Sequence, residues 1–199
     1  MTSNRQERSE RTRERLLDAT VESLIEIGYA RTSMQEVCTR AELSRGAQLH
    51  HFPTKAGLMA AAIEHLTRKQ TERVLLVGEN LPEGPDRMEA LIDLMWEGFS
   101  GPLAKASIEL WVACANDPEL RAVMLPVDRT LAHATLELCR KYAGTADPKV
   151  VETIGWLTID LHRGIAVDEL LGGDPKRRAH LLETWKRMAV ATLREADRP

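Results

Sequence analysis

The sequence is poor in aromatic residues and contains no long hydrophobic run. Phenylalanine, tryptophan and tyrosine together make up 4% of the 199 residues, whereas alanine, leucine, glutamate and arginine are abundant. This composition predicts helices rather than sheets. No run approaches the roughly 18 apolar residues of a transmembrane helix, so we expect no membrane partner.

Cysteine is scarce too, and no signal peptide is recognisable. Cys38, Cys114 and Cys139 fit neither a C-x-x-C motif nor a metal-ligand spacing, which predicts buried thiols and neither a metal nor another cofactor. The first twenty residues, MTSNRQERSERTRERLLDAT, are charged and lack the apolar core of a secretory signal. We therefore expect a cytoplasmic protein.

A large excess of one charge is also lacking, since the net charge is −3. The distribution is uneven, however, because residues 1–55 hold nine Lys/Arg against eight Asp/Glu. Most of these acids precede Glu42, so Arg45 and Lys55 have no acidic neighbours in sequence. The N-terminal part is thus where we expect a negatively charged partner to bind.

What the sequence does contain is helical periodicity along nearly its whole length. Apolar residues recur every three or four positions, and no segment alternates convincingly as a strand would. Gly28 predicts the end of the first helix. Predicted capping residues are Thr32 or Ser33, Ser44, Thr54, Asp86, Asp117, Asp147 and Asp174. We expect about nine helices, near residues 11–27, 33–41, 44–52, 54–76, 88–99, 101–114, 118–142 (kinked or split at Pro126), 149–171 and 175–195.

The predicted fold class is all-α, with two domains and a tail. Residues 1–10 are polar and are expected to be a disordered tail. Residues 11–55 should form a three-helix unit, and residues 56–199 a second, larger helical domain. Within the latter, GENLPEGPDR at residues 78–87 has two glycines and two prolines and predicts a linker.

The stretch SRGAQLHHF, residues 44–52, suggests what the N-terminal unit binds. A helix, a tight turn and a short polar helix form a helix-turn-helix motif, whose second helix enters a DNA major groove about 12 Å wide. Gly46 and Ala47 are small enough for close approach. Arg45 can pair with guanine and Gln48 with adenine.

A metal site is the competing interpretation of the same stretch. His50 and His51 are adjacent, so they point roughly 100° apart on a helix and cannot share a metal on one face. No third ligand is near them in sequence. We therefore favour DNA over a metal.

Residues 31–58, RTSMQEVCTRAELSRGAQLHHFPTKAGL, resemble the DNA-binding part of the TetR-type transcriptional regulators. The matching positions are Thr32, Ser33, Val37, Ala41, Ser44, Arg45, Gly46, His51, Phe52 and Lys55. Glu42 stands where the family usually has glycine, and Leu49 where it often has a tyrosine that contacts phosphate. Gln48 replaces a frequent leucine or threonine.

The resemblance implies roles for individual residues. Expected contacts to the DNA backbone are Thr32, Ser44, His51 and Lys55, and expected contacts to bases are Arg45, Ala47, Gln48 and His50. With Ser33, Gly46 and Leu49 these make up the predicted DNA-binding set. The resemblance further implies a homodimer built on the last two helices, with a small-molecule pocket among the middle helices.

The second domain should therefore contain a ligand site and a dimer interface. A ligand site is mostly apolar with a few convergent polar groups. The candidate ligand residues are Met95, Trp96, Phe99, Trp111, Cys114, His133, Trp156, Asp160 and Arg163. The candidate interface residues are Trp156, Leu161, Leu181, Trp185, Met188 and Thr192. An alternative remains open, in which the aromatic residues are plain core and Arg163 pairs with Asp160 across the dimer.

These patterns predict a ligand-responsive, sequence-specific DNA-binding regulator. We expect a repressor that an unidentified small molecule releases from a palindromic operator. None of the common nucleotide-binding, metalloprotease or serine-hydrolase motifs occurs, so we expect no catalytic residues and no enzyme. Two alternatives remain, a regulator that senses redox state through a thiol and a helical adaptor that does not bind DNA.

Overall fold

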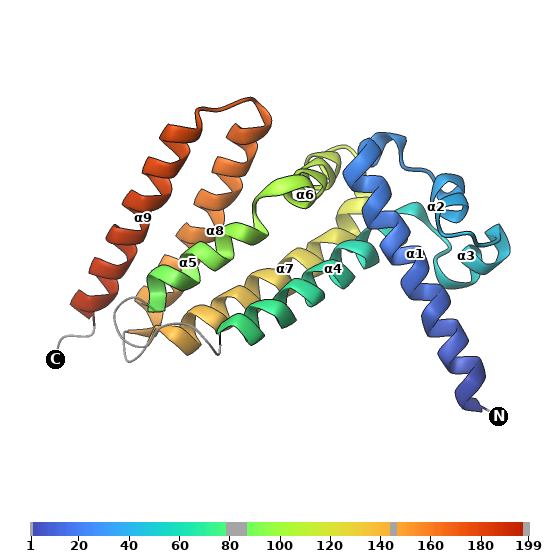
Figure 1. The fold of residues 1–199 in the computed structure, drawn as a ribbon, viewed down its shortest axis with the longest axis horizontal. Helices are drawn as coiled ribbons and strands as arrows, with labels where there is room; N and C mark the ends of the chain where they lie inside the picture. Colours follow the sequence, from blue (N-terminus) through green and yellow to red (C-terminus); the bar gives the residue numbers. More distant parts are fainter. Residues whose placement is uncertain (1, 79–86, 144–146, 197–199) are drawn as a thin grey trace. The chain divides into compact units, whose positions relative to one another are not determined.

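The structure, a computed structural model, describes residues 2–78, 87–143 and 147–196 (Figure 1). In these ranges it contains nine helices and no strand. They are α1 (Thr2–Arg31), α2 (Met34–Arg40), α3 (Arg45–His51), α4 (Lys55–Gly78), α5 (Arg87–Gly98), α6 (Gly101–Ala113), α7 (Pro118–Tyr142), α8 (Pro148–Leu170) and α9 (Pro175–Ala196). The all-α prediction is confirmed, while most of the predicted linker at 78–87, including Asp86, lies outside the described residues.

The chain divides into two compact units whose boundary falls inside helices. The first unit contains the described residues up to Lys69 together with Ala106–Val127, and the second lies within Gln70–Lys105 and Asp128–Pro199. The predicted domain boundary between residues 55 and 56 stays a prediction, and the two compact units divide elsewhere. The reason is that α4 and α6 each contribute one part to each unit, as α7 does.

The beginning and the end of α1 both differ from a simple helix over 11–27. α1 begins at Thr2, within the residues 1–10 that were expected to form a disordered tail, and the expected tail stays a prediction. Gly28 does interrupt the regular helix, with φ 76° and ψ 169°. The chain nevertheless returns to helical hydrogen bonding as far as Arg31, so Gly28 marks a kink rather than the end.

Capping side chains begin most of the other helices as predicted. The Ser33 hydroxyl accepts from Glu36 N–H and the Ser44 hydroxyl from Ala47 N–H. Thr54 caps α4 through the N–H of Gly57. The carboxylates of Asp117, Asp147 and Asp174 likewise accept N–H groups at the starts of α7, α8 and α9. Pro126 lies inside α7, which is not split there.

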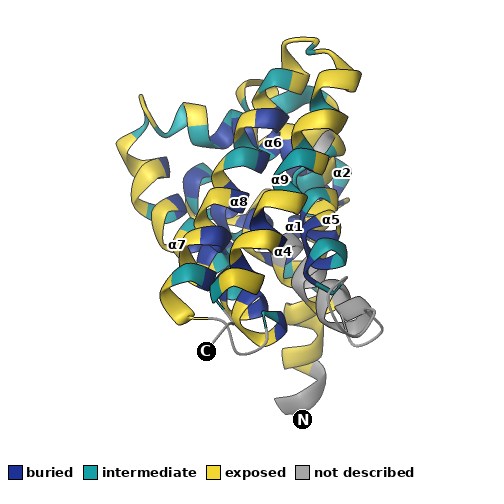
Figure 2. Cartoon of the chain, turned by 90° about the vertical axis from the view of Figure 1, so that its left-hand side faces the viewer, coloured by how far each residue is buried: buried dark blue, intermediate teal, exposed yellow. Residues whose placement is uncertain are grey.

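The core of the second unit is formed by α5, α7, α8 and α9 (Figure 2). Its largest fully buried members include Leu91 and Ile159. Cys139 belongs to this core, and burial raises the pKa of its thiol to about 11. A thiol held in its protonated form is a poor nucleophile, which weighs against redox sensing at Cys139. Among the described residues, no helix has both the length and the hydrophobicity that spanning a membrane requires.

Candidate nucleic-acid interface

Two arginines hold α2 and the following turn against α1. Arg40 on α2 lies 2.7 Å from the carboxylate of Glu26 and 3.7 Å from that of Glu22, both on α1. Arg15 on α1 donates a 2.6 Å hydrogen bond to the carbonyl oxygen of Ala41, at the C-terminal end of α2. These contacts orient α2 and thereby fix the point from which α3 departs.

The turn between α2 and α3 requires a left-handed residue, and Glu42 provides it. Its φ is 51°, a conformation that favours glycine, and among the described residues no other non-glycine residue has a positive φ. The strained conformation is stabilised by N–H groups of Glu42 and Leu43 that donate to carbonyls of α2. The carboxylate of Glu42 also lies 3.5 Å from Arg15. The tight turn expected from the sequence is thus present, with glutamate at the position where the family usually has glycine.

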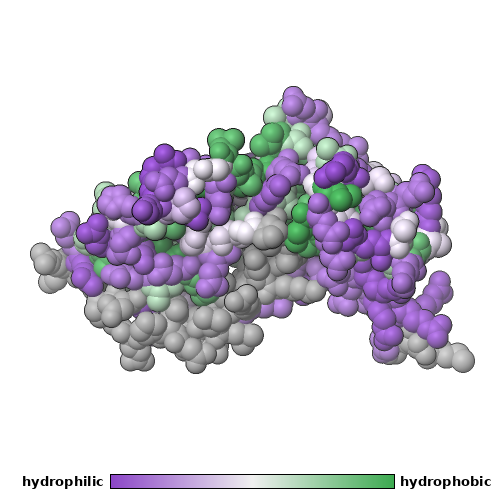
Figure 3. Space-filling model, turned by 45° about the horizontal axis from the view of Figure 1, so that its top comes forward, coloured by the Kyte–Doolittle hydropathy of each residue, from purple (hydrophilic) through white to green (hydrophobic). Residues whose placement is uncertain are grey.

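The outward face of α3 matches the surface of a major-groove-reading helix. Arg45, Gly46 and His50 are exposed, and Leu49 keeps 49% of its surface accessible. Ala47 is half-buried and small. Around this face the surface of the first three helices is mostly hydrophilic, at the right of Figure 3. The exposed cation, the small residues and the imidazole are therefore available to a DNA duplex.

Gln48 was predicted to contact a base, and here the structure requires a correction. Its side chain is only 1% exposed, and its amide nitrogen donates to the carbonyl oxygen of Phe52 at the end of α3. This hydrogen bond satisfies a backbone carbonyl at the end of the helix, and the Gln48 side chain therefore does not point outward. The helical period, on which residues 45 and 49 face outward, places residue 48 toward α1 and the core.

The two residues before α2 differ in their exposure. Thr32 is buried, and its N–H and hydroxyl both donate to the carbonyl oxygen of Gly28, so its side chain does not reach the surface. Ser33 is exposed at the start of α2. Of the pair, Ser33 is the residue placed to meet a phosphate.

Lys55 also departs from its expected role as a phosphate contact. Its ammonium nitrogen donates a 3.0 Å hydrogen bond to the carbonyl oxygen of Tyr29 and lies 4.2 Å from the centroid of the Tyr29 ring. Burial lowers the pKa of Lys55. The positive charge is thus used inside the protein, where it fixes the start of α4 to the end of α1.

The histidine pair is split between surface and interior. The rings of His50 and His51 meet edge to face with centroids 5.3 Å apart. His51 is half-buried, and burial, followed by the neighbouring His50 and Arg13, lowers its pKa. His51 is therefore neutral at pH 7 and offers an N–H rather than a charge. His50 is exposed on α3.

A second connection, which no sequence pattern predicted, joins the end of α1 to α6 and α7 in the first unit. The N–H of Tyr29 donates to the carboxylate of Glu109 at 2.9 Å, and the Tyr29 hydroxyl donates to Asp117 at 3.2 Å. Burial and the neighbouring Asp117 raise the pKa of Tyr29 to about 12. The sequence predicted only the cap at Asp117 and the break at Gly28. The hydrogen bond between Tyr29 and Glu109 was not predictable, because the two residues are 80 positions apart in the chain.

The candidate ligand residues are dispersed over the two units. Trp111 and Cys114 belong to the first unit, and the other seven belong to the second. His133, Trp156 and Asp160 are exposed on the second unit, and their assignment to the ligand site stays a prediction. Trp156 and Asp160 are exposed one turn apart on α8. Met95, Trp96 and Phe99 remain at or beside the core.

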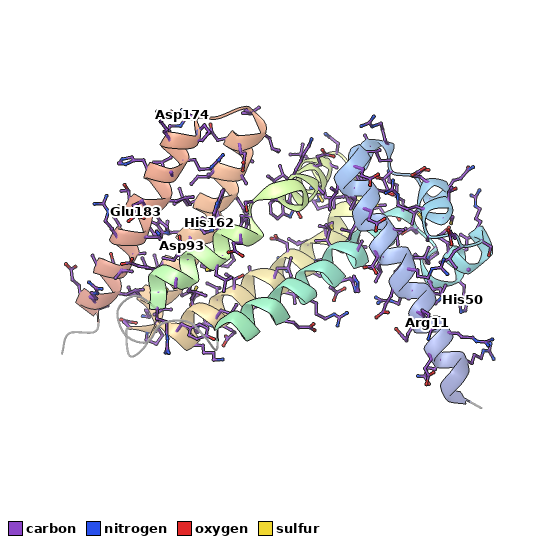
Figure 4. All side chains as sticks on the ribbon, viewed as in Figure 1. Arg11, His50, Asp93, His162, Asp174 and Glu183 are labelled. Carbon is purple, nitrogen blue, oxygen red and sulfur yellow. The ribbon has the colours of Figure 1, made fainter. Side chains whose placement is uncertain are left out.

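The polar residues of α8 make partners within their own unit. Arg163 lies 2.6 Å from Asp128 on α7 and 3.9 Å from Asp160. The idea that Arg163 pairs with Asp160 across a dimer is therefore not needed to explain either residue. His162, by contrast, is completely buried and packs against Trp96 of α5 and against Phe99, the residue that follows α5. In Figure 4 it lies on the part of α8 beside α5.

The candidate interface residues separate into exposed and interior ones. Leu181, Met188 and Thr192 are exposed along one side of α9, and Trp156 is exposed on α8. Leu161 is half-buried. Trp185 instead packs against the core and donates its indole N–H to the hydroxyl of Thr158 at 3.0 Å. Leu157 and Val167 of α8, with Leu171 at its C-terminal cap, are exposed as well and extend the apolar stripe.

Known proteins resemble this chain in the DNA-binding part and beyond. The family model described as "Bacterial regulatory proteins, tetR family" matches residues 16–62, which contain all of α2 and α3. The HTH-type transcriptional regulator CymR of Pseudomonas putida is 32% identical over 176 residues, covering 86% of this chain and 85% of CymR. The HTH-type transcriptional regulator BetI of Burkholderia mallei is 30% identical over 138 residues, covering 67% of this chain and 68% of BetI.

A solved structure shares the fold. The crystal structure of multidrug binding protein EbrR complexed with imidazole has a TM-score of 0.64 and 26% sequence identity to this chain. The similarity covers 88% of this chain and 93% of EbrR. The likeness therefore extends well past the helix-turn-helix into the second half of the chain.

Proposed function

The chain belongs to the TetR family of bacterial regulatory proteins and is a transcriptional regulator, and we propose that it is a repressor which a small molecule releases from a palindromic operator. The observation that carries the DNA-reading part is the outward face of α3, with Arg45 and His50 exposed beside the small Gly46 and Ala47. We assign base contacts to Arg45, Ala47 and His50. Arg45 is the residue best suited to pair with guanine, because its guanidinium can form two parallel hydrogen bonds.

The backbone contacts are assigned to a smaller set than the sequence predicted. Ser33 and Ser44 are exposed at the starts of α2 and α3, and each hydroxyl keeps its hydrogen for a phosphate oxygen. The neutral imidazole of His51 can donate one further hydrogen bond. Leu49 is exposed and apolar, so it fits contact with a thymine methyl group or a sugar. Such contacts orient the helix, whereas Arg45 and His50 determine the sequence it prefers.

A palindromic operator requires two copies of α3. The exposed apolar stripe on α8 and α9 supports a homodimer, because a monomer rarely leaves so much apolar surface on adjacent helices uncovered. In a symmetric dimer the two recognition helices reach successive major grooves about 34–36 Å apart. The effector then acts by favouring a conformation with a different spacing, to the extent that its affinity differs between the two conformations. EbrR, whose structure contains bound imidazole, supports a ligand-binding second domain.

The experiment is selection of DNA from a random library by the full-length protein, followed by fluorescence anisotropy. The selected duplex and a scrambled duplex are compared at two salt concentrations for three proteins, which are wild type, Arg45→Ala and Gln48→Leu. We expect a palindromic selected sequence and a loss of about 1–3 kcal/mol of sequence preference in Arg45→Ala. Gln48→Leu is the matched control, since a buried residue should leave the preference unchanged.

Either of two results would overturn the proposal. The first is a selection that yields no sequence bound better than scrambled DNA. The second is a sequence preference that Arg45→Ala keeps and Gln48→Leu loses. That result would show that Gln48, and not Arg45, contacts the bases. Asymmetric selected sites would contradict the palindromic operator while leaving DNA binding intact.

A further inference from the structure

His162 is a polar side chain placed where the second unit otherwise buries apolar ones. It is 0% exposed, and neither ring nitrogen has a hydrogen-bond partner among the residues that the structure describes. Its ring meets the Trp96 ring at 5.4 Å between centroids and the Phe99 ring at 5.6 Å. Buried polar groups are nearly always hydrogen-bonded, so an imidazole without a partner calls for an explanation.

Two polar residues near His162 on the same helix form hydrogen bonds. The Thr158 hydroxyl, one turn earlier, donates to the carbonyl oxygen of Ile154 and accepts the indole N–H of Trp185. Arg163, the next residue, pairs with Asp128. Thr158 and Arg163 thus each have a hydrogen-bond partner, whereas neither ring nitrogen of His162 has one among the described residues.

We propose that His162 is the polar anchor of the effector site, and that this site takes an uncharged aromatic alcohol of the phenol type. The proposal rests on the proposed function, because it assigns the ligand class to the effector of the regulator. The hydroxyl pairs with an imidazole nitrogen of His162, and the aromatic body of the ligand packs with Trp96 and Phe99. Trp96 and Phe99 are both half-buried, so they border the interior without being sealed in it.

The chemical class of the ligand follows from the hydrogen bonds that a buried imidazole can donate and accept. Burial lowers the pKa of His162 to about 4, so the ring is neutral at pH 7, with one donor and one acceptor nitrogen. A hydroxyl can donate to one nitrogen or accept from the other, so it fits either tautomer. A carboxylate would be buried beside a neutral ring with no opposite charge, which is costly. A quaternary ammonium has no N–H to give to the acceptor nitrogen.

The test uses the DNA-free, full-length protein labelled with ¹⁵N at its histidines. Phenol, toluene, benzoate and benzyltrimethylammonium are titrated separately, and both the affinity and the ring-nitrogen resonances are followed by NMR. Three proteins are compared, which are wild type, His162→Phe and, as matched control, His180→Phe at an exposed histidine of α9. His162→Leu serves as a second variant if phenylalanine does not fit beside Trp96.

We expect phenol to shift the His162 nitrogen resonances and to bind about tenfold more tightly than toluene. This preference should disappear in His162→Phe and persist in His180→Phe. The proposal is overturned if the preference is the same with and without His162, if no probe moves the His162 resonances, or if benzoate or the ammonium ion is preferred in a His162-dependent way. A histidine that is merely buried or paired with water gives the first or second of these results.

The outcome is independent of the DNA-binding experiment. Specific DNA binding together with failure of the phenol test would leave the regulator intact and remove only the assigned ligand class. A positive phenol test with no sequence-specific DNA binding would support the ligand site at His162 and refute the proposed function as a DNA-binding regulator. Release of the selected operator by phenol, lost in His162→Phe, would join the two.

Discussion

The ammonium group of Lys55 lies 4.2 Å from the centre of the Tyr29 ring and donates to the carbonyl oxygen of that same residue. Tyr29 in turn donates its N–H to Glu109 and its hydroxyl to Asp117. Within the first unit, the end of α1 is thus held by α4, α6 and α7 at once. A residue that sequence resemblance assigns to DNA is here part of the framework that positions α1.

Replacing Lys55 with methionine should therefore lower stability rather than the number of phosphate contacts. Methionine keeps much of the apolar stem but removes the ammonium, so we expect a loss of about 1–2 kcal/mol of unfolding free energy from the cation–π contact and the hydrogen bond. Denaturant unfolding measures this loss. The slope of log affinity for DNA against log salt concentration should stay at its wild-type value.

The salt dependence separates the two roles of Lys55. A lysine that contacts a phosphate contributes about one unit to that slope. A Lys55→Met variant of wild-type stability, whose slope is smaller by about one, would place the ammonium on DNA and refute the structural role. Arg187→Met, at an exposed position of α9 in the second unit, is a control for removal of a positive charge alone.

Gly28 provides a second test of the same junction. Its φ of 76° and ψ of 169° lie in a region that residues with a side chain rarely adopt, and a Cβ there would lie 2.6 Å from a carboxylate oxygen of Glu109. Gly28→Ala should therefore cost about 1–3 kcal/mol from the backbone conformation, in addition to displacing Glu109. The measurement is thermal or denaturant unfolding.

The double variant Gly28→Ala with Glu109→Ala divides the cost into two parts. Removing the Glu109 carboxylate relieves the steric overlap but not the unfavourable φ. We expect the double variant to lose less stability than the sum of the two single variants, because they compete for the same space. Strict additivity would show that the close approach of Glu109 to residue 28 does not occur.

Local signals explain why so much of the fold was predictable. The caps at Ser33, Ser44 and Asp117 each involve a hydrogen bond to a residue two or three positions away, so the sequence contains both partners side by side. The start of α1 was not predictable in the same way. Residues 1–10 have no apolar stripe, and the pattern that marks a packed helix cannot detect a helix without one.

The site was predictable in outline but not in its individual side chains. Arg45 and His50 were expected at the surface, and they are there. Gln48 and Lys55 bond instead to the carbonyl oxygens of Phe52 and Tyr29. Polar residue type suggests a surface role, whereas a carbonyl that needs a donor is visible only after the chain has folded. His162 is the opposite case, a polar residue whose lack of a partner appears only in the structure.

The buried His162 should also make stability depend on pH. The unfolded chain binds a proton at an ordinary histidine pKa of about 6.5, whereas the folded chain resists protonation until about pH 4. Because the folded pKa is the lower one, its contribution to stability is fully present above pH 6.5 and is lost as the pH falls toward 4. We expect a decrease of about 3 kcal/mol over this window from this residue.

Denaturant unfolding of wild type and His162→Phe between pH 4 and pH 7 measures this contribution. The difference in unfolding free energy between the two proteins should change by about 3 kcal/mol across the window, since phenylalanine does not titrate. His180→Phe should run parallel to wild type. Parallel curves for wild type and His162→Phe would mean that the His162 ring is hydrated in the folded protein.

The exposed stripe on α8 and α9 gives the last prediction, which concerns assembly. Met188 is 58% exposed, and with Leu181 and Thr192 it lies on one side of α9, seven and four residues from them. Leu157, Val167 and Leu171 form the matching stripe on α8, where Gly164 leaves open space for a neighbouring chain. A partner that covers both stripes would bury Met188 in each copy of a symmetric dimer.

Met188→Glu should therefore convert the protein to a monomer without unfolding it. A carboxylate buried without a partner costs several kcal/mol, and a symmetric interface contains it twice, so we expect the dissociation constant to rise at least about a hundredfold. Sedimentation equilibrium measures the change, and circular dichroism verifies that the helices remain. Arg187→Glu, an exposed neighbour about 100° away on the helix, should stay dimeric. Because two recognition helices bind one palindrome, the Met188→Glu monomer should also lose affinity for the full operator while keeping the wild-type affinity for a half-site. A Met188→Glu variant that remains dimeric would show that the partner covers another surface.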